Sequence, residues 1–266
     1  MKASSMGGQL QDKVIVISGV GPGMGKTLAE QCAQQGAQVV LGARSADFIE
    51  AVAAGIRKAG GQSVAVAADV AKPEDCRRLI TAAEEHFGGL DGLVNSAYRF
   101  EAGLFETADL KAWRAAMDVT CFGALILAQA AVPLLRKRNG GAIVNVSTSS
   151  TRTFTNGVGG YAIPKAALEM ATRILAQELG PLNIRVNATL MGWMDGEPMK
   201  RGFAARAKAR GVTEDALTAE LMNAIPLRRM VSDSECARAV IFFLSDQSSA
   251  ITGALLNVNG GMFMSA

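Results

Sequence analysis

Short apolar runs alternate along the chain with longer amphipathic stretches rich in alanine. Most of the short runs are β-branched and continuously apolar, as strands are when helices cover both faces of a parallel sheet. Seven strands are predicted, at Val14–Ser18, Gln38–Gly42, Ser63–Ala67, Gly92–Asn95, Ala142–Ser147, Ile184–Ala188 and Leu255–Val258. Helical periodicity predicts helices near Met24–Gln35, Ala46–Ala59, Pro73–Phe87, Leu110–Arg138, Tyr161–Leu179 and Asp233–Leu244.

This alternation predicts right-handed βαβ units in a single-domain, Rossmann-like, doubly wound α/β fold, with a seven-stranded parallel sheet and helices on both faces. No linker-like segment divides residues 1–266. Only Met191–Met230 departs from the alternation, with about forty residues of helical composition, and insertions of that length are usually functional. Because it follows the carboxyl end of a strand, we expect residues 191–230 to form a substrate lid over the ligand crevice.

Composition and charge exclude several classes of function. A hydrophobic content of 49% in 266 residues supports a large core, and a net charge of +3 does not suggest a nucleic-acid partner. One histidine, His86, leaves little basis for a His-based metal site or a Ser-His-Asp hydrolase. The four cysteines lie far apart and form no Cys-x-x-Cys pair, so neither a zinc site nor a disulfide framework is predicted.

The sequence also predicts a cytoplasmic protein without a membrane partner. The N-terminus has no apolar core of the kind found in signal peptides. The longest apolar stretch, Cys121–Leu135, contains Gln129 and Pro133 and is shorter than the about 20 residues that a spanning helix needs.

A glycine-rich loop follows the first predicted strand and opens a helix. Its residues are Gly19, Val20, Gly21, Pro22, Gly23, Met24 and Gly25. Such a loop lets the backbone approach a pyrophosphate at the helix N-terminus. Gly25-Lys26-Thr27 resembles the end of a P-loop, but the first glycine of that motif would fall on Val20. The G-x-G-x-x-G pattern fails as well, whereas G-x-x-x-G-x-G fits.

Together with Tyr161-x-x-x-Lys165, this loop resembles the short-chain dehydrogenase/reductase family. Further landmarks occur in the family's order, at Asp69-Val70, Leu93–Ala97, Ile143–Ser147, Arg185–Ala188, Ile251–Gly253 and Val258–Gly261. The Tyr-x6-Lys pattern of the enoyl-reductase branch is absent because position 168 is leucine. The resemblance implies a nicotinamide-dependent enzyme that interconverts a carbonyl compound and a secondary alcohol.

Tyr161 and Lys165 are the candidate catalytic pair. Residues four apart share one face of a helix, so a neighbouring ammonium is expected to lower the phenol's pKa from about 10 toward 7 and produce a general acid/base. The resemblance implies that Tyr161 exchanges the proton with the substrate oxygen and that Lys165 also holds the nicotinamide ribose. A serine is expected 13 residues before the tyrosine; Thr148 stands there and Ser149 follows, so either hydroxyl could orient the carbonyl. The resemblance also implies an asparagine that helps to hold a proton-relay water in the helix after the fourth strand, and Thr120 stands in its place.

The coenzyme prediction favours NADP(H), with NAD(H) as the alternative. After the second strand, alanine stands where an acid would accept the ribose hydroxyls, and Arg44 follows, suited to a 2′-phosphate. The resemblance implies that Asp69 and Val70 lie beside the adenine. The remaining implied coenzyme contacts are Ser45, Asn95, Ala97, Gly192 and Met194, besides the glycine loop, Tyr161 and Lys165.

Large apolar residues follow the carboxyl ends of strands and predict an apolar substrate pocket. They are Tyr98, Phe154, Met191, Trp193 and Met199. Five basic residues within 200–210 raise the hypothesis of an acyl-thioester or acyl-carrier substrate. The family resemblance implies a homotetramer or homodimer. Two alternatives stay open: a catalytically impaired NADP(H)-binding sensor or scaffold, and a P-loop hydrolase, for which Tyr161 and Lys165 would have no use.

Overall fold

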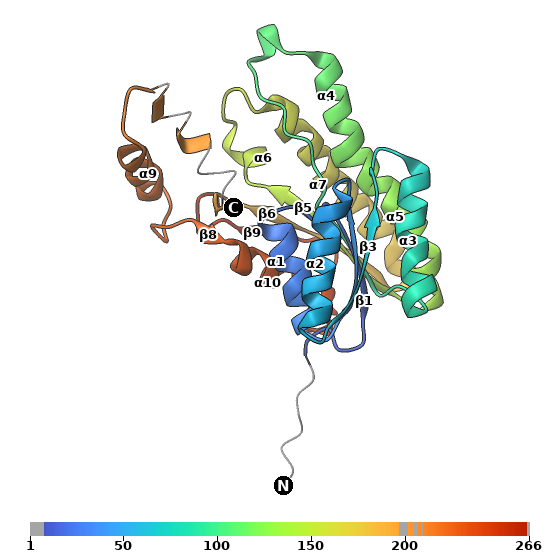
Figure 1. Ribbon diagram of the computed structural model, residues 1–266. Coiled ribbons are helices and arrows are strands. Elements are labelled where there is room, and N and C mark those ends of the chain that lie inside the picture. Colours follow the sequence, from blue (N-terminus) through green and yellow to red (C-terminus); the bar gives the residue numbers. More distant parts are fainter. Residues whose placement is uncertain (1–7, 197–201, 205–206, 209, 265–266) are drawn as a thin grey trace.

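The computed structural model describes residues 8–196, 202–204, 207–208 and 210–264, and its centre is one parallel sheet (Figure 1). The strand order is β3-β2-β1-β4-β5-β6-β9. The strands are β1 Val14–Ser18, β2 Gln38–Ala43, β3 Gln62–Ala67, β4 Gly92–Asn95, β5 Gly141–Thr148, β6 Ile184–Met191 and β9 Leu255–Val258. The order reverses between β1 and β4, which is the switch point where such sheets form a ligand crevice.

Helices cover both faces of the sheet because alternate residues of each strand point to opposite sides. Ile15 and Ile17 of β1 join a core beneath α1, α2 and α10, whereas Val14 and Val16 join a second core beneath α3, α5 and α7. These helices are α1 Met24–Gln34, α2 Ala46–Lys58, α3 Pro73–Phe87, α5 Gly123–Lys137, α7 Gly159–Leu179 and α10 Asp233–Leu244. The predicted fold class, a single doubly wound α/β domain, is confirmed.

The long helix predicted at Leu110–Arg138 is interrupted. It consists of α4 Leu110–Met117, a π-helical turn η2 at Asp118–Phe122, and α5. A Cβ on Gly123 would lie 2.8 Å from the Val70 side chain, so the first residue of α5 must be small for the helix to pass the end of β3. By length and composition alone, Leu110–Lys137 could cross a membrane; here it packs against α3 and α7.

The strand predicted to end at Ala188 continues for three more residues, and β6 pairs with β9 up to Met191, the first residue of the segment predicted as a lid. That residues 191–230 cover the crevice as a lid stays a prediction. After it, β7 Met194–Asp195 pairs in parallel with β8 Val231–Ser232. Helix α9, Glu214–Asn223, stands apart from the sheet in Figure 1. The shorter elements are α6 Ser150–Thr153, η1 Phe105–Thr107, η3 Gly180–Leu182 and η4 Asp246–Ser248.

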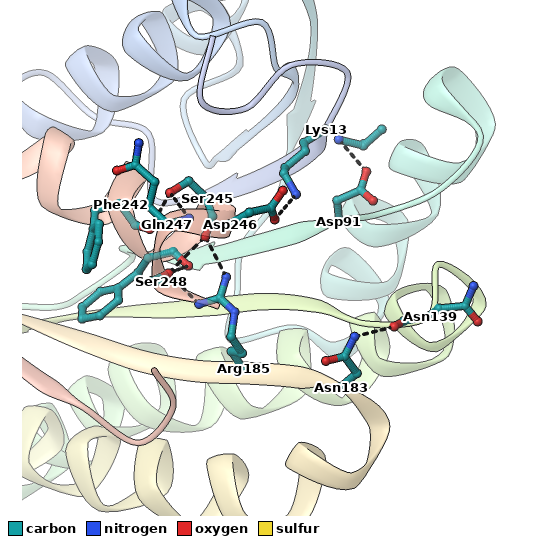
Figure 2. Close-up of polar contacts among 12 residues, drawn as sticks. Lys13, Asp91, Asn139, Asn183, Arg185, Phe242, Ser245, Asp246, Gln247 and Ser248 are labelled. Carbon is teal, nitrogen blue, oxygen red and sulfur yellow. Dashed lines mark hydrogen bonds and ion pairs between the residues drawn. The ribbon is translucent and has the colours of Figure 1, made fainter. Parts of the chain in front are cut away.

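A polar seam ties together the amino ends of the strands (Figure 2). Arg185 at the start of β6 donates to the Ser248 hydroxyl at 2.7 Å and to the Ser245 carbonyl at 3.1 Å. Lys13, just before β1, pairs with Asp246 at 2.8 Å. These contacts hold together the amino ends of the strands, at the opposite end of the sheet from the crevice.

The four cysteines, Cys32, Cys76, Cys121 and Cys236, are all buried and free. Burial raises the pKa of each thiol, to about 11 for Cys76 and about 12 for Cys236. Thiolates therefore scarcely form in the folded protein at neutral pH.

Candidate active site

The glycine loop after β1 touches the loop after β4 through the backbone. A Cβ on Gly19 would lie 2.3 Å from the Ala97 backbone nitrogen, and the residue has a φ of +79°. A Cβ on Gly25 would lie 2.9 Å from the Gly19 carbonyl oxygen, whereas one on Gly21 would meet nothing within 4 Å. The loop thus requires glycine at position 19 for its own folding, and Gly21 faces open space where a ligand can approach.

The amino end of α1 suits an anion. Gly23 precedes the helix with a φ of +104°, its cap offers no side-chain hydrogen bond, and the first turn has no acidic residue. The first N–H groups of such a helix lack intrahelical partners and attract negative charge. Asp233 lies near Gly23, and burial together with the neighbouring Asp195 raises the pKa of its carboxyl. The residues present therefore fit the pyrophosphate of a dinucleotide.

The predicted adenosine-side residues lie along the carboxyl ends of β2 and β3. Arg44 and Ser45 are exposed directly after β2, and no residue in the described part of the chain pairs with Arg44. The Asp69 carboxylate accepts the backbone N–H of Ala71 at 3.1 Å. Val70 is buried. A basic group thus follows β2 directly and is exposed.

Asn95 differs from the expectation. Its amide donates to the Asn145 side chain at 2.9 Å, and Asn145 donates in turn to the Thr172 hydroxyl at 2.9 Å. These two hydrogen bonds link β4, β5 and α7 within the interior. The amide nitrogen of Asn95 is thus bonded within the interior, and its contact with the coenzyme stays a prediction, whereas Ala97 borders the glycine loop.

Thr148 and Tyr161 meet at the carboxyl end of β5. Thr148 is the last residue of the strand, and its hydroxyl donates to the Ser150 hydroxyl at 3.2 Å. Tyr161 lies in the first turns of α7, where the neighbouring Thr148 hydroxyl acts to lower the pKa of the phenol. The Ser149 hydroxyl instead accepts the amide of Asn259 at 3.1 Å and is fully buried. Of the two hydroxyls left open by the sequence, Thr148 is the one beside the phenol.

Lys165 lies beneath this pair, but its head group does not bond to Tyr161. The ammonium donates to the Val146 carbonyl at 2.5 Å and lies 5.5 Å from the centre of the Tyr98 ring. Burial lowers the pKa of Lys165 to about 7, and the nearby Glu169 partly opposes this. Burial also raises the pKa of Tyr161, which the Thr148 hydroxyl only partly offsets. The expectation of an acidified phenol is therefore wrong for this structure, because both groups are desolvated and the ammonium is turned to a carbonyl.

Aromatic rings surround the Tyr161 phenol. The ring centres of Tyr98 and Phe100 lie 5.6 and 5.2 Å from that of Tyr161. Thr120, buried in the π-helical turn, accepts the backbone N–H of Arg99 at 3.1 Å and so holds the loop that carries both rings. Phe100 was not among the predicted site residues, although the spacing of aromatic residues two apart after β4 could have indicated it.

The other predicted substrate residues are dispersed. Phe154 is 85% exposed beside α6, and Trp193 packs edge-on against Phe203 at 5.3 Å. Met191 is 3% exposed within the core because β6 extends to include it, and its place in the pocket stays a prediction. Of the implied coenzyme contacts, Gly192 packs on Asn259, and Met194 lies in β7. Met199 lies outside the described residues.

A buried carboxylate, Glu169, was likewise not among the predicted site residues. It accepts the Ser147 hydroxyl at 2.6 Å and the Arg152 guanidinium at 2.6 Å, and the Thr151 hydroxyl lies 2.7 Å away. The spacing of four residues from Lys165 is the signal that could have found it.

Comparison with known proteins gives matches over nearly the whole chain. The family model described as "Enoyl-(Acyl carrier protein) reductase" matches residues 19–263. A 2-(S)-hydroxypropyl-CoM dehydrogenase of Xanthobacter autotrophicus is 32% identical, over 97% of this chain and 99% of its own. A 3-oxoacyl-[acyl-carrier-protein] reductase of Staphylococcus epidermidis is 30% identical, over 95% and 100%. The structure of L-sorbose reductase from Gluconobacter frateurii, complexed with NADPH and L-sorbose, superimposes with a TM-score of 0.91 at 29% identity, covering 98% of this chain and 99% of that one.

Proposed function

The chain belongs to the short-chain dehydrogenase/reductase family, and from that premise we propose that it is an NADP(H)-dependent oxidoreductase interconverting a ketone and a secondary alcohol. The observation that carries this proposal is that the Tyr161 phenol lies beside the Thr148 hydroxyl at the carboxyl end of β5. The hydroxyls of Tyr161 and Thr148 lie side by side above the buried Lys165. They lie at the carboxyl ends of the strands, as the glycine loop does.

A nicotinamide dinucleotide fits the residues of the crevice. The backbone of the glycine loop and the amino end of α1 would hold the pyrophosphate, and Lys165 would hold the nicotinamide ribose. The reduced coenzyme supplies a hydride for the carbonyl carbon. The chain's own part is to fix the carbonyl oxygen and to move a proton.

Tyr161 is suited to donate that proton when a ketone is reduced. Because burial raises its pKa, the phenol is protonated at neutral pH and can act as an acid toward the developing alkoxide. The Thr148 hydroxyl donates a second hydrogen bond to the same oxygen. A positive charge on Lys165 stabilises the phenolate left behind, which makes the protonation state of that lysine important to the reaction.

The preference for NADP(H) over NAD(H) rests on Arg44. It is exposed, unpaired within the described residues, and follows β2 directly, and a guanidinium suits a phosphate in bidentate geometry. The NADPH in the L-sorbose reductase structure is consistent with this choice.

For the substrate we propose a small ketone with an apolar substituent. Tyr98 and Phe100 flank the phenol and are each 54% exposed, so they offer a ligand two aromatic surfaces. An acyl thioester has less support from this chain, because Arg210 of the basic segment already pairs with Glu220 through both nitrogens. The Tyr-x-x-x-Lys spacing favours carbonyl over enoyl reduction.

We propose further that the protein pairs with copies of itself through α4 and α7. Leu110, Ile163, Met170 and Ile174 on these helices are each more than half exposed, and apolar patches of this kind mark interfaces. Light scattering of the purified protein, compared with a variant carrying Ile163→Glu and Ile174→Glu, tests the assembly.

The activity is tested with a panel of ketones and an acyl-thioester substrate, each assayed with NADPH and NADH. Tyr161→Phe should reduce ketone turnover by about 10²- to 10⁴-fold, the usual contribution of a general acid, while coenzyme fluorescence shows unchanged NADPH binding. A variant as fast as the wild type would remove Tyr161 from its role. Coenzyme binding by the wild type with no turnover on any substrate would favour the sensor or scaffold alternative.

A further inference from the structure

Glu169 is an ionisable group buried beneath the proposed catalytic residues. Its side chain is 3% exposed, and a carboxylate withdrawn from water is costly unless it is paired and hydrogen-bonded. Here Ser147 of β5 and Arg152 of α6 each contact it at 2.6 Å. The site is thus a built charge pair between α6 and α7, with Arg152 reaching in from the more exposed side.

The second buried ion of this region lies on the same helix face. Lys165 precedes Glu169 by four residues and is 1% exposed, and residues four apart on a helix are neighbours. Both ions lie in an interior from which water is excluded, where charges act on each other more strongly than in water.

We propose that the Glu169–Arg152 pair sets the protonation state of Lys165, with Glu169 as a positioning residue for the reaction and Arg152 as its counter-ion. The inference rests on the proposed function in that it gives Lys165 a catalytic purpose. A negative Glu169 favours the ammonium form of Lys165. Arg152 weakens that effect by neutralising part of the carboxylate charge.

Few other charged or titratable groups face Lys165. Tyr161 and Glu169 lie on the same helix as Lys165, and Arg152 on α6 pairs with Glu169. The loop after β4 contributes the Tyr98 ring, and β5 contributes the neutral Val146 carbonyl. The charged residues Arg114 of α4 and Asp118 of η2 are exposed. Burial and Glu169 are accordingly the two direct influences on the pKa of Lys165, which lies near 7 where small changes alter the charge, and Arg152 acts on it through Glu169.

The test is a direct titration of Lys165 in the full chain. Lysine labelled with ¹³C at Cε is followed by ¹H–¹³C NMR, and Lys165→Met identifies the signal. Glu169→Gln, which keeps the shape and removes the charge, should lower the pKa of Lys165 by about one pH unit; Arg152→Met should raise it by a comparable amount. Glu178→Gln, the same change at an exposed position of α7, is the matched control and should leave it unchanged.

Opposite shifts in the two variants support the proposal, since a merely structural role would not move the titration in two directions. An unchanged titration, or shifts of the same sign, overturns it. If Glu169→Gln does not fold, Arg152→Met decides alone, and the absence of a rise rejects the proposal. In kinetics, the pH above which kcat for ketone reduction falls should move with the NMR titration. Failure of the enzyme to reduce any ketone would contradict the proposed function and leave the titration result standing.

Discussion

The hydroxyl of Thr120 accepts the backbone N–H of Arg99 at 3.1 Å, joining the π-helical turn before α5 to the loop that carries Tyr98 and Phe100. A residue that the family resemblance associates with the reaction thus has a supporting contact here. It holds the two aromatic rings against the phenol of Tyr161.

Replacing Thr120 by valine should loosen this loop. The variant keeps the shape of the side chain and loses the acceptor, at a cost of about 1 kcal/mol, which corresponds to a fall in Tm of about 2–4 °C for a chain of this size. KM for an apolar ketone should rise more than kcat falls, because the rings are displaced and the proton donor is not. Thr120→Ser retains the hydroxyl and should behave as the wild type; equal effects of both variants would contradict the role of the hydrogen bond.

Replacing two glycines of the glycine-rich loop after β1 by alanine should have different effects on stability. Gly19→Ala would place a Cβ 2.3 Å from the Ala97 nitrogen at a positive φ, so the free energy of unfolding should fall by about 2 kcal/mol or more. Gly21→Ala meets no atom within 4 Å and should unfold at the wild-type denaturant concentration. If coenzyme approaches over Gly21, this second variant will bind NADPH more weakly while remaining stable. Equal stability of the two variants in urea titrations would argue against the close contact of the loops.

Arg44→Asp should reverse the coenzyme preference. The change removes a partner for a 2′-phosphate and adds a repelling charge, so the ratio of kcat/KM for NADPH to that for NADH should fall by about tenfold or more, the equivalent of one charge-assisted hydrogen bond. Lys58→Asp, the same charge change at the exposed end of α2, is the control. An unchanged ratio in Arg44→Asp would show that another group selects the coenzyme.

The buried Lys165 predicts a pH dependence of stability. Its pKa is about 7 in the folded protein and 10.5 in the unfolded reference. Between these values the unfolded chain binds a proton that the folded protein does not, so the contribution of this site to the free energy of unfolding rises with pH. From pH 7 to pH 8 the wild type should gain about 1 kcal/mol relative to Lys165→Met, measured as the difference between their urea unfolding curves. Taking the difference cancels the effect of the cysteines, which titrate in both proteins. A constant difference over this range would contradict a depressed pKa for Lys165.

The sheet could be predicted from the sequence because its signals are local. Apolar runs such as Val14–Ser18 and Gly92–Asn95 have the observed bounds, since strands buried on both faces need an unbroken series of apolar residues. The extension of β6 to Met191 depends on pairing with β5 on one side and with β9 on the other, and β9 lies more than sixty residues later, so no local pattern contains it. Met191 is buried between these two strands.

Head-group contacts were the least predictable part of the site. Helical spacing places Tyr161 and Lys165 on one face, yet which acceptor the ammonium meets depends on how α7 packs on β5. The π-helical turn around Thr120 likewise adds a residue to a helix whose hydrophobic pattern is otherwise continuous. Hydrophobic periodicity shows which face of a helix a residue lies on, but it does not determine which atom the end of its side chain contacts.

The burial of all four thiols has a practical consequence for measuring how this protein opens. An alkylating reagent reacts with thiolate, so it labels these sulfurs only in molecules that have transiently lost their native packing. Mass spectrometry of the alkylated protein would then give the rate at which each cysteine becomes accessible. Cys32 and Cys236 would report on the α1–α10 layer, and Cys76 on the opposite face of the sheet. No engineered probe would be required.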